Sequence, residues 1–126
     1  MAEVEIDRDT GAMRLTRYLM VDDYGAMINP RLTEGQVHGG VTQGIGQAMW
    51  EEVAYDPDTA QLLSGTLMDY TVPRAAHLPS FEVHFRQTPT LNNPLGVKGS
   101  GQAGCIGAPQ TVMAAGLDAL KPLGIT

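Results

Sequence analysis

Residues 2–23 alternate apolar and polar side chains on both sides of a short turn sequence, Asp9-Thr10-Gly11. Alternation with a period of two indicates strands with one buried face, and Asp and Gly favour tight turns. This stretch therefore predicts a β-hairpin. Asp7 and Asp9 have the spacing that opens a calcium-binding loop, but the later ligands and the closing Glu of that motif are missing. We assign both aspartates to the turn.

Two later segments also indicate β-structure. Residues 51–70 hold two apolar stretches on either side of the turn sequence DPDT, which predicts a second strand-turn-strand unit. Residues 80–87 alternate again and place Phe81, Val83 and Phe85 on one face of a further strand. The sequence therefore predicts a substantial content of sheet.

Two helices are predicted among these strands. Thr33 and Gln36 match a capping box, so the first helix is expected to begin at Thr33 and to end near residue 50. The second is expected from Pro109 to Lys121, because proline is accepted in a first helical turn and a further Pro and Gly follow. Its expected packing face consists of Val112, Gly116, Ala119 and Leu120. Strands in hairpins, rather than in strand-helix-strand alternation, favour an α+β fold in which β-hairpins pack with two main helices.

Composition excludes several classes of function. The chain has 126 residues, the size of one ordinary domain. Its net charge of −6 and its scattered basic residues argue against a nucleic-acid partner, and no apolar run reaches the ~18 residues of a membrane span. A single cysteine, Cys105, excludes an internal disulfide and a multi-thiolate metal site, and the three histidines lack metal-site spacing. With no signal-peptide pattern at the N-terminus, a reducing, cytoplasmic setting is expected.

Residues 99–104 read GSGQAG and match the dinucleotide-binding pattern G-x-G-x-x-G. That fingerprint requires a strand leading into the glycines, but the preceding stretch contains two prolines and two asparagines, so a Rossmann site is not predicted. Lys98 also lacks the spacing of a Walker loop. Two interpretations remain. The glycines either let the backbone approach an electron-rich ligand at the start of a helix or form an ordinary connection.

The first predicted helix contains an unusual number of glycines. Each interior glycine costs about 1 kcal/mol relative to alanine, so some close packing must offset this cost. One side of the helix is apolar and is expected to be core: Val37, Val41, Ile45, Ala48 and Met49. The opposite side carries Gln36, Gly40, Gln43 and Gln47. This Gly/Gln face suits a ligand or another chain, and a solvated face is the open alternative. His38 falls on the apolar side.

Four segments, taken in order, resemble a known family. Residues 21–52, 68–83, 89–104 and 106–124 resemble the C-terminal part of the molybdopterin-binding large subunit of the xanthine dehydrogenase, aldehyde oxidase and aerobic carbon monoxide dehydrogenase family. The resemblance implies that residues 1–126 are a single segment of a molybdopterin-binding domain in a longer subunit. It implies a molybdenum ion on a pterin dithiolene, often as a cytosine dinucleotide in bacterial members. It also implies iron-sulfur and flavin subunits or domains that receive the electrons.

The resemblance also assigns site residues. Gln43 matches a glutamine beside the cofactor, and Gly99, Ser100 and Gly101 match the loop that brings the backbone up to the metal centre. Gln102 occupies the position of a glutamate that takes a proton from the molybdenum-bound hydroxyl. A neutral amide can donate and accept hydrogen bonds but cannot act as this base. The resemblance therefore predicts the fold and the cofactor class and leaves the reaction open.

The leading hypothesis is the cofactor-lining segment of a molybdenum-dependent oxidoreductase, of hydroxylase or carbon monoxide dehydrogenase type, inactive by itself. Its partner would be the remainder of the large subunit, and the isolated chain is expected to retain no molybdenum cofactor and to self-associate. The alternative is a stand-alone binding or assembly module that uses the Gly/Gln face against a protein partner.

Overall fold

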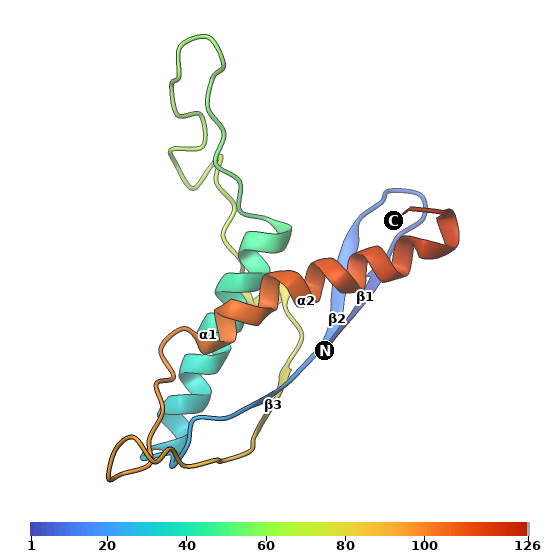
Figure 1. The fold of residues 1–126 in the computed structure, drawn as a ribbon. Helices are drawn as coiled ribbons and strands as arrows, with labels where there is room; N and C mark the ends of the chain where they lie inside the picture. Colours follow the sequence, from blue (N-terminus) through green and yellow to red (C-terminus); the bar gives the residue numbers. More distant parts are fainter. Residues whose placement is uncertain (126) are drawn as a thin grey trace.

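The computed structural model describes residues 1–125 and has an α+β architecture (Figure 1). Three strands form one sheet in the order β1-β2-β3, and two long helices pack with it. The elements are β1 (Ala2–Ile6), β2 (Met13–Asp22), α1 (Pro30–Met49), β3 (Phe81–Phe85) and α2 (Ala103–Leu120), with short 3-10 turns at Ala75–His77 and Lys121–Leu123. The predicted fold class is confirmed.

The predicted hairpin of β1 and β2 is confirmed. The two strands pair in antiparallel register, from Ala2 opposite Tyr18 to Ile6 opposite Met13, with an irregularity between Glu3 and Val4. Asp7 makes the turn, because its Oδ1 accepts hydrogen bonds from the backbone N–H groups of Asp9 (3.1 Å) and Thr10 (2.8 Å) and from the Thr10 hydroxyl (2.8 Å). These hydrogen bonds lower the pKa of the Asp7 carboxyl. The Asp7 carboxylate therefore stabilises the turn, as predicted.

The strand predicted near residue 81 is present as β3, but its partner was not foreseen. β3 pairs in parallel with β2, from Tyr18 opposite Phe81 to Asp22 opposite Phe85, so β2, α1 and β3 form one strand-helix-strand crossover. The expectation that strands come only in hairpins is therefore wrong for this pair. Local alternation predicts a strand, whereas its partner depends on residues about 60 positions away.

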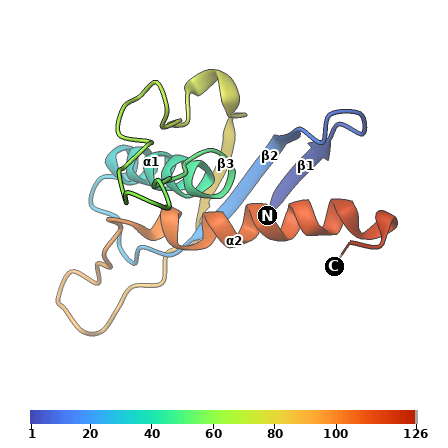
Figure 2. The same ribbon diagram turned by 90° about the horizontal axis from the view of Figure 1, so that it is seen from above.

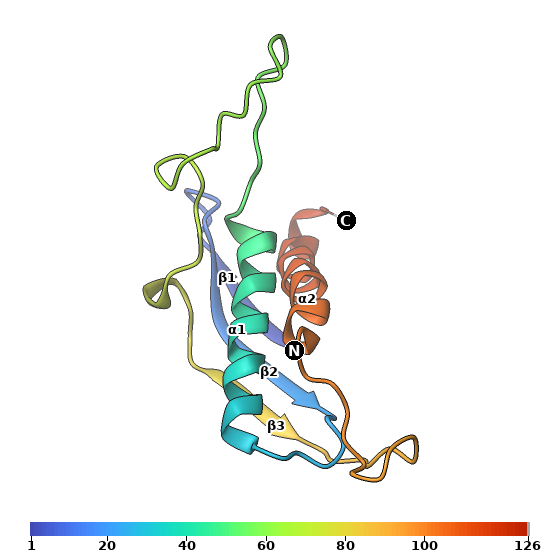
Figure 3. The ribbon, with the colours of Figure 1, turned by 90° about the vertical axis from the view of Figure 1, so that its left-hand side faces the viewer.

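The second strand-turn-strand unit, predicted within residues 51–70, is wrong in its strands and right in its turn. Asp56 Oδ1 accepts hydrogen bonds from the N–H groups of Asp58 (3.0 Å) and Thr59 (2.7 Å), but only one isolated bridge, Tyr55 to Leu62, joins the flanking stretches. Residues 51–72, here called the arm, instead extend away from the helices (Figure 3). Because nothing in residues 1–125 covers the arm, most of its apolar side chains stay exposed, among them Leu67 and Met68.

α1 begins earlier than predicted and has a different cap. Asn29 is the N-cap, and its side chain accepts a hydrogen bond from the N–H of Leu32 (3.1 Å), with Pro30 as the first helical residue. The capping box is therefore wrong: the Thr33 hydroxyl donates to the Asn29 carbonyl (3.0 Å), and the Gln36 side chain bonds elsewhere. The expected core side is confirmed, since Val37, Val41 and Ile45 are fully buried.

α2 begins at Ala103, six residues before the predicted start, and contains Pro109 in its interior. It ends where predicted, since a 3-10 turn and Gly124, with a φ of +77°, follow. Val112 and Gly116 of its expected packing face are buried, whereas Ala119 is exposed. Figures 1 and 2 show the first half of α2 crossing α1 and the second half running past the β1–β2 hairpin.

Glycines bring the two helices together. A Cβ added to Gly40 would lie 3.0 Å from the backbone nitrogen of Cys105, and one added to Gly44 would lie 2.7 Å from the Ala108 Cβ and 2.9 Å from the Pro109 Cδ. Close packing against α2 therefore offsets the cost of these two glycines in α1. Gly40, placed on the Gly/Gln face, is buried in this contact, while the three glutamines of that face are exposed.

Candidate functional site

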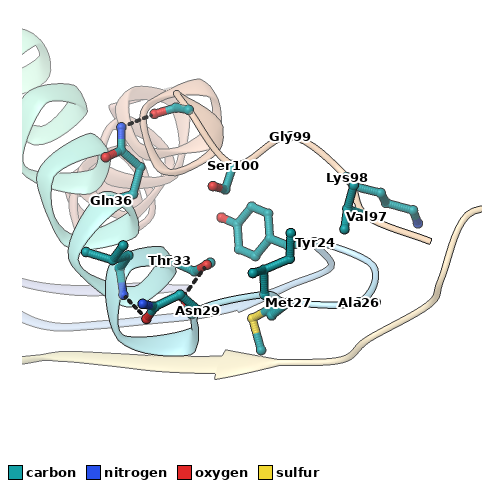
Figure 4. Close-up of a pocket in the computed structure, with 13 residues that line it drawn as sticks. Tyr24, Ala26, Met27, Asn29, Thr33, Gln36, Val97, Lys98, Gly99 and Ser100 are labelled. Carbon is teal, nitrogen blue, oxygen red and sulfur yellow. Dashed lines mark hydrogen bonds between the residues drawn. The ribbon is translucent and has the colours of Figure 1, made fainter. Parts of the chain in front are cut away.

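A pocket of about 400 Å³ lies where the glycine loop, residues 97–101, passes the start of α1 (Figure 4). One wall is formed by residues between Tyr24 and Gln36, and the other by the loop itself. Tyr24 is buried, and its hydroxyl donates a hydrogen bond to Asp22. Burial, and then the neighbouring Asp22 carboxylate, raise the pKa of Tyr24, which keeps this phenol neutral.

Four side-chain and backbone contacts hold the upstream end of the glycine loop. The Asn93 side chain accepts from the Val97 N–H (3.2 Å) and donates to the Val97 carbonyl (3.0 Å), and the Lys98 N–H donates to the Tyr24 carbonyl (3.0 Å). The Lys98 ammonium pairs with Asp23. The two Lys98 contacts attach the loop to the segment that links β2 to α1.

Asp23 is the charged anchor of this attachment. Besides Lys98, its carboxylate accepts hydrogen bonds from the backbone N–H groups of Gly25 (2.8 Å) and Thr88 (2.9 Å). The Lys98 hydrogen bond, followed by those from Thr88 and Gly25, holds the pKa of the Asp23 carboxyl well below its usual range. The carboxylate therefore stays charged well into the acid range.

Gly99 and Gly101 of the loop are not needed by the packing of residues 1–125. A Cβ added to Gly99 or Gly101 would meet nothing within 4 Å, and neither residue has a positive φ. Gly96 differs, because its φ is +66° and a Cβ there would lie 2.9 Å from the Pro89 Cβ. Gly99 and Gly101 therefore leave space on the side that faces away from the rest of the described chain.

The backbone of the loop is free to bind. No hydrogen bond within residues 1–125 uses the N–H groups of Gly99, Ser100 or Gly101, and α2 begins two residues later, at Ala103. The pocket lining contains one charged side chain among the described residues, Lys98, and no carboxylate. Free N–H groups next to a helix N-terminus favour an electron-rich or anionic group. The loop thus fits the kind of ligand that its sequence predicts.

The structure brings Gly99, Ser100 and Gly101 together with Gln36, whose Nε2 donates a hydrogen bond of 2.7 Å to the Gly101 carbonyl. Gln43 is exposed two turns farther along α1 and does not line the pocket. Gln102 is the N-cap residue of α2; its side chain makes no capping hydrogen bond and lies outside the pocket lining. Sequence reasoning assigned Gln36 to a cap and missed its contact with the loop.

Other reactive side chains do not gather in residues 1–125. No group of three or more His, Cys, Asp or Glu residues could hold a metal ion there. Cys105 is a half-buried free thiol. His38 packs edge to face on Phe81, with 5.5 Å between the ring centres, and its buried Nε2 has no hydrogen-bond partner. Within the same residues, neither helix has the length and apolar character needed to cross a membrane.

Comparison with known proteins identifies the family. The family profile described as molybdopterin cofactor-binding domain matches residues 1–79. The chain belongs to this family. The molybdopterin-domain chain is 41% identical over 121 residues to the nicotine 6-hydroxylase large subunit of Paenarthrobacter nicotinovorans, covering 96% of the chain and 15% of that relative. The resemblance found in the sequence is thereby confirmed.

Solved structures share the fold. Quinoline 2-oxidoreductase from Pseudomonas putida 86 matches with a TM-score of 0.92 and 46% identity, over 96% of the molybdopterin-domain chain and 15% of the solved chain. The Cu,Mo-carbon monoxide dehydrogenase matches with a TM-score of 0.90 and 37% identity. The match covers 95% of the molybdopterin-domain chain and 15% of the solved chain. The chain thus spans about 15% of the length of the proteins that it matches.

Proposed function

We propose that the chain forms a cofactor-lining segment of a molybdenum-dependent oxidoreductase large subunit, of the hydroxylase or carbon monoxide dehydrogenase type. In this proposal, residues 1–126 act as one segment of a molybdopterin-binding domain, and the remaining walls of the cofactor site come from other parts of a large subunit. Iron-sulfur and flavin subunits or domains receive the electrons. Family membership and the match to about 15% of each relative support this role.

The glycine loop is the observation that carries the proposal. Gly99 and Gly101 are open on one side without any packing or backbone reason in this chain, and three successive N–H groups have no partner within residues 1–125. A bulky anionic group is the ligand that such a loop suits, because the backbone can approach it closely and donate hydrogen bonds to it. A molybdopterin cofactor, with its dithiolene and phosphate groups, is a ligand of this kind.

Each proposed site residue has a role that its chemistry permits. Gly99 and Gly101 bring the backbone close to the cofactor, and Ser100 offers its hydroxyl and N–H as hydrogen-bond donors. Gln43 and Gln102 contribute amide groups that donate and accept hydrogen bonds. When bound, the cofactor supplies the redox centre that accepts electrons from the substrate. Gln102 orients a ligand or the substrate and does not take up a proton, since a neutral carboxamide has no basic site of useful strength.

A graft tests this assignment. In the graft, this chain replaces the matching segment, about 15%, of the Cu,Mo-carbon monoxide dehydrogenase chain. We expect Gly101→Val to lower the molybdenum content of the purified graft strongly, because the added side chain occupies space that the cofactor needs. Gly65→Val is the matched control, since a Cβ there makes only ordinary contacts of 3.6 Å or more and the residue lies in the arm. Equal molybdenum content in both variants would remove the glycine loop from the cofactor site.

A further inference from the structure

We propose that Gln36 is the positioning residue of the glycine loop: its amide group tethers the loop to α1 and sets the direction in which the loop presents its backbone. Both partners of this hydrogen bond, Gln36 and Gly101, lie in this chain, so the tether does not depend on a cofactor. Its consequence for a bound cofactor rests on the function proposed above.

The tether joins two distant parts of the sequence. Gln36 Nε2 donates to the Gly101 carbonyl over 2.7 Å, across a separation of 65 residues (Figure 4). Upstream, the loop is held as far as Lys98, and no hydrogen bond within residues 1–125 joins the backbone of Gly99 or Ser100 to another residue. The Gln36 amide is therefore the polar contact that holds the downstream end of the free stretch.

α1 is a rigid base for this tether. Val37, the next residue, is fully buried, and a Cβ on Gly104 of α2 would lie 2.6 Å from the Val37 carbonyl oxygen. The two helices therefore meet at a fixed separation beside Gln36. Because the loop runs directly into α2, a side chain of the length of glutamine can connect α1 to the last loop carbonyl.

The hydrogen bond also orients a peptide group. A trans peptide is planar and its C=O and N–H point in opposite directions, so fixing the Gly101 carbonyl toward α1 fixes the Gln102 N–H away from it. The direction of the Gln102 N–H, which follows the three free N–H groups of the loop, thus depends on a donor at position 36. A residue of similar length without a donor cannot replace glutamine in this role.

Hydrogen exchange of the 126-residue chain, followed by mass spectrometry, tests the tether without requiring any cofactor. Gln36→Met keeps the length of the side chain and removes the donor. The hydrogen-bonded N–H groups of residues 97–107, such as those of Lys98 and Cys105, should therefore exchange about fivefold to tenfold faster, the loss of one net hydrogen bond. Gln36→Lys keeps a donor and should restore protection close to that of the unaltered chain. Gln47→Met, on an exposed part of the same helix, is the matched control and should leave this segment unchanged.

Two results would overturn the proposal: protection in Gln36→Met equal to that of the unaltered chain, or equal loss of protection in Gln36→Met and Gln36→Lys. The exchange result stands independently of the proposed function. If Gln36→Met loosens the loop while Gly101→Val leaves the molybdenum content of the graft intact, the tether is supported and the cofactor role of the loop fails.

Discussion

Gly104 of α2 lies directly against the backbone of Val37 in α1, so that an added Cβ would stand 2.6 Å from the Val37 carbonyl oxygen and 2.9 Å from the Val41 nitrogen. This contact joins the two helices at the point where the glycine loop enters α2. It therefore couples the packing of the core to the position of the candidate site.

Substitution at this contact should destabilise the fold. We expect Gly104→Ala to lower the free energy of unfolding by about 1–3 kcal/mol, because backbone atoms that cannot rotate away block the methyl group. Gly107→Ala is the control in the same helix, where a Cβ would meet nothing within 4 Å. It should raise stability by about 0.5–1 kcal/mol, since alanine favours a helix more than glycine does. Urea unfolding followed by circular dichroism measures both, and equal effects would contradict the packing account.

The Asp23–Lys98 anchor should give the stability a specific dependence on pH. A carboxyl whose pKa is lower in the folded chain stabilises the fold above its unfolded pKa of about 3.9, and this contribution is lost as the pH falls toward the folded value. Asp23→Asn should therefore lower the urea midpoint at pH 7, and the deficit should shrink only below about pH 4. Asp58→Asn, an exposed change of the same charge, should show little deficit at either pH. A deficit for Asp23→Asn that is constant from pH 7 to pH 3 would contradict this role.

Exposed apolar side chains on the arm should drive self-association. Leu67 is 75% exposed and Met68 is 93% exposed, in a segment that nothing else in the described chain covers. We expect concentration-dependent oligomers in sedimentation experiments, weakened when both residues are changed to serine. Leu123→Ser, an exposed apolar residue outside the arm, is the control and should have a smaller effect. A monomer over a wide concentration range that binds no hydrophobic dye would exclude this association.

Local patterns predicted the parts of the fold that depend on neighbouring residues. Alternation found the β1–β2 hairpin and β3, and helical spacing found the buried side of α1, with Val37, Val41 and Ile45. The start of α2 was placed at Pro109, because proline is accepted in a first helical turn, but the helix also includes the preceding Gly104 and Gly107. Their helical conformation is favoured by contacts such as that of Gly104 with Val37, which sequence spacing does not contain.

The residues of the candidate site were also predicted only in part. The resemblance pointed to Gly99, Ser100 and Gly101, and the structure places all three in one pocket. Gln36 was missed because its partner, Gly101, is 65 residues away and contributes a backbone carbonyl, which has no signature in the sequence. Side chains that bind backbone groups of distant loops cannot be found from residue types alone.

Gln102 can be tested in the graft by adding a titratable group. Gln102→Glu should leave the molybdenum content intact and change the pH dependence of turnover, while Gln102→Ala should reduce turnover by less than the ~10²-fold expected for loss of a general base. Steady-state rates from pH 5 to pH 9 measure both effects. An unchanged pH profile in Gln102→Glu, or a large loss of molybdenum in both variants, would place this residue away from the cofactor.

The most direct test of the central claim is the molybdenum content per polypeptide, measured by elemental analysis on the isolated chain and on the unaltered graft. The account predicts a value close to zero for the isolated chain, because most of the cofactor contacts come from other segments, and a value approaching one for the graft. Stoichiometric molybdenum on the isolated chain, or none on a folded graft, would contradict the account.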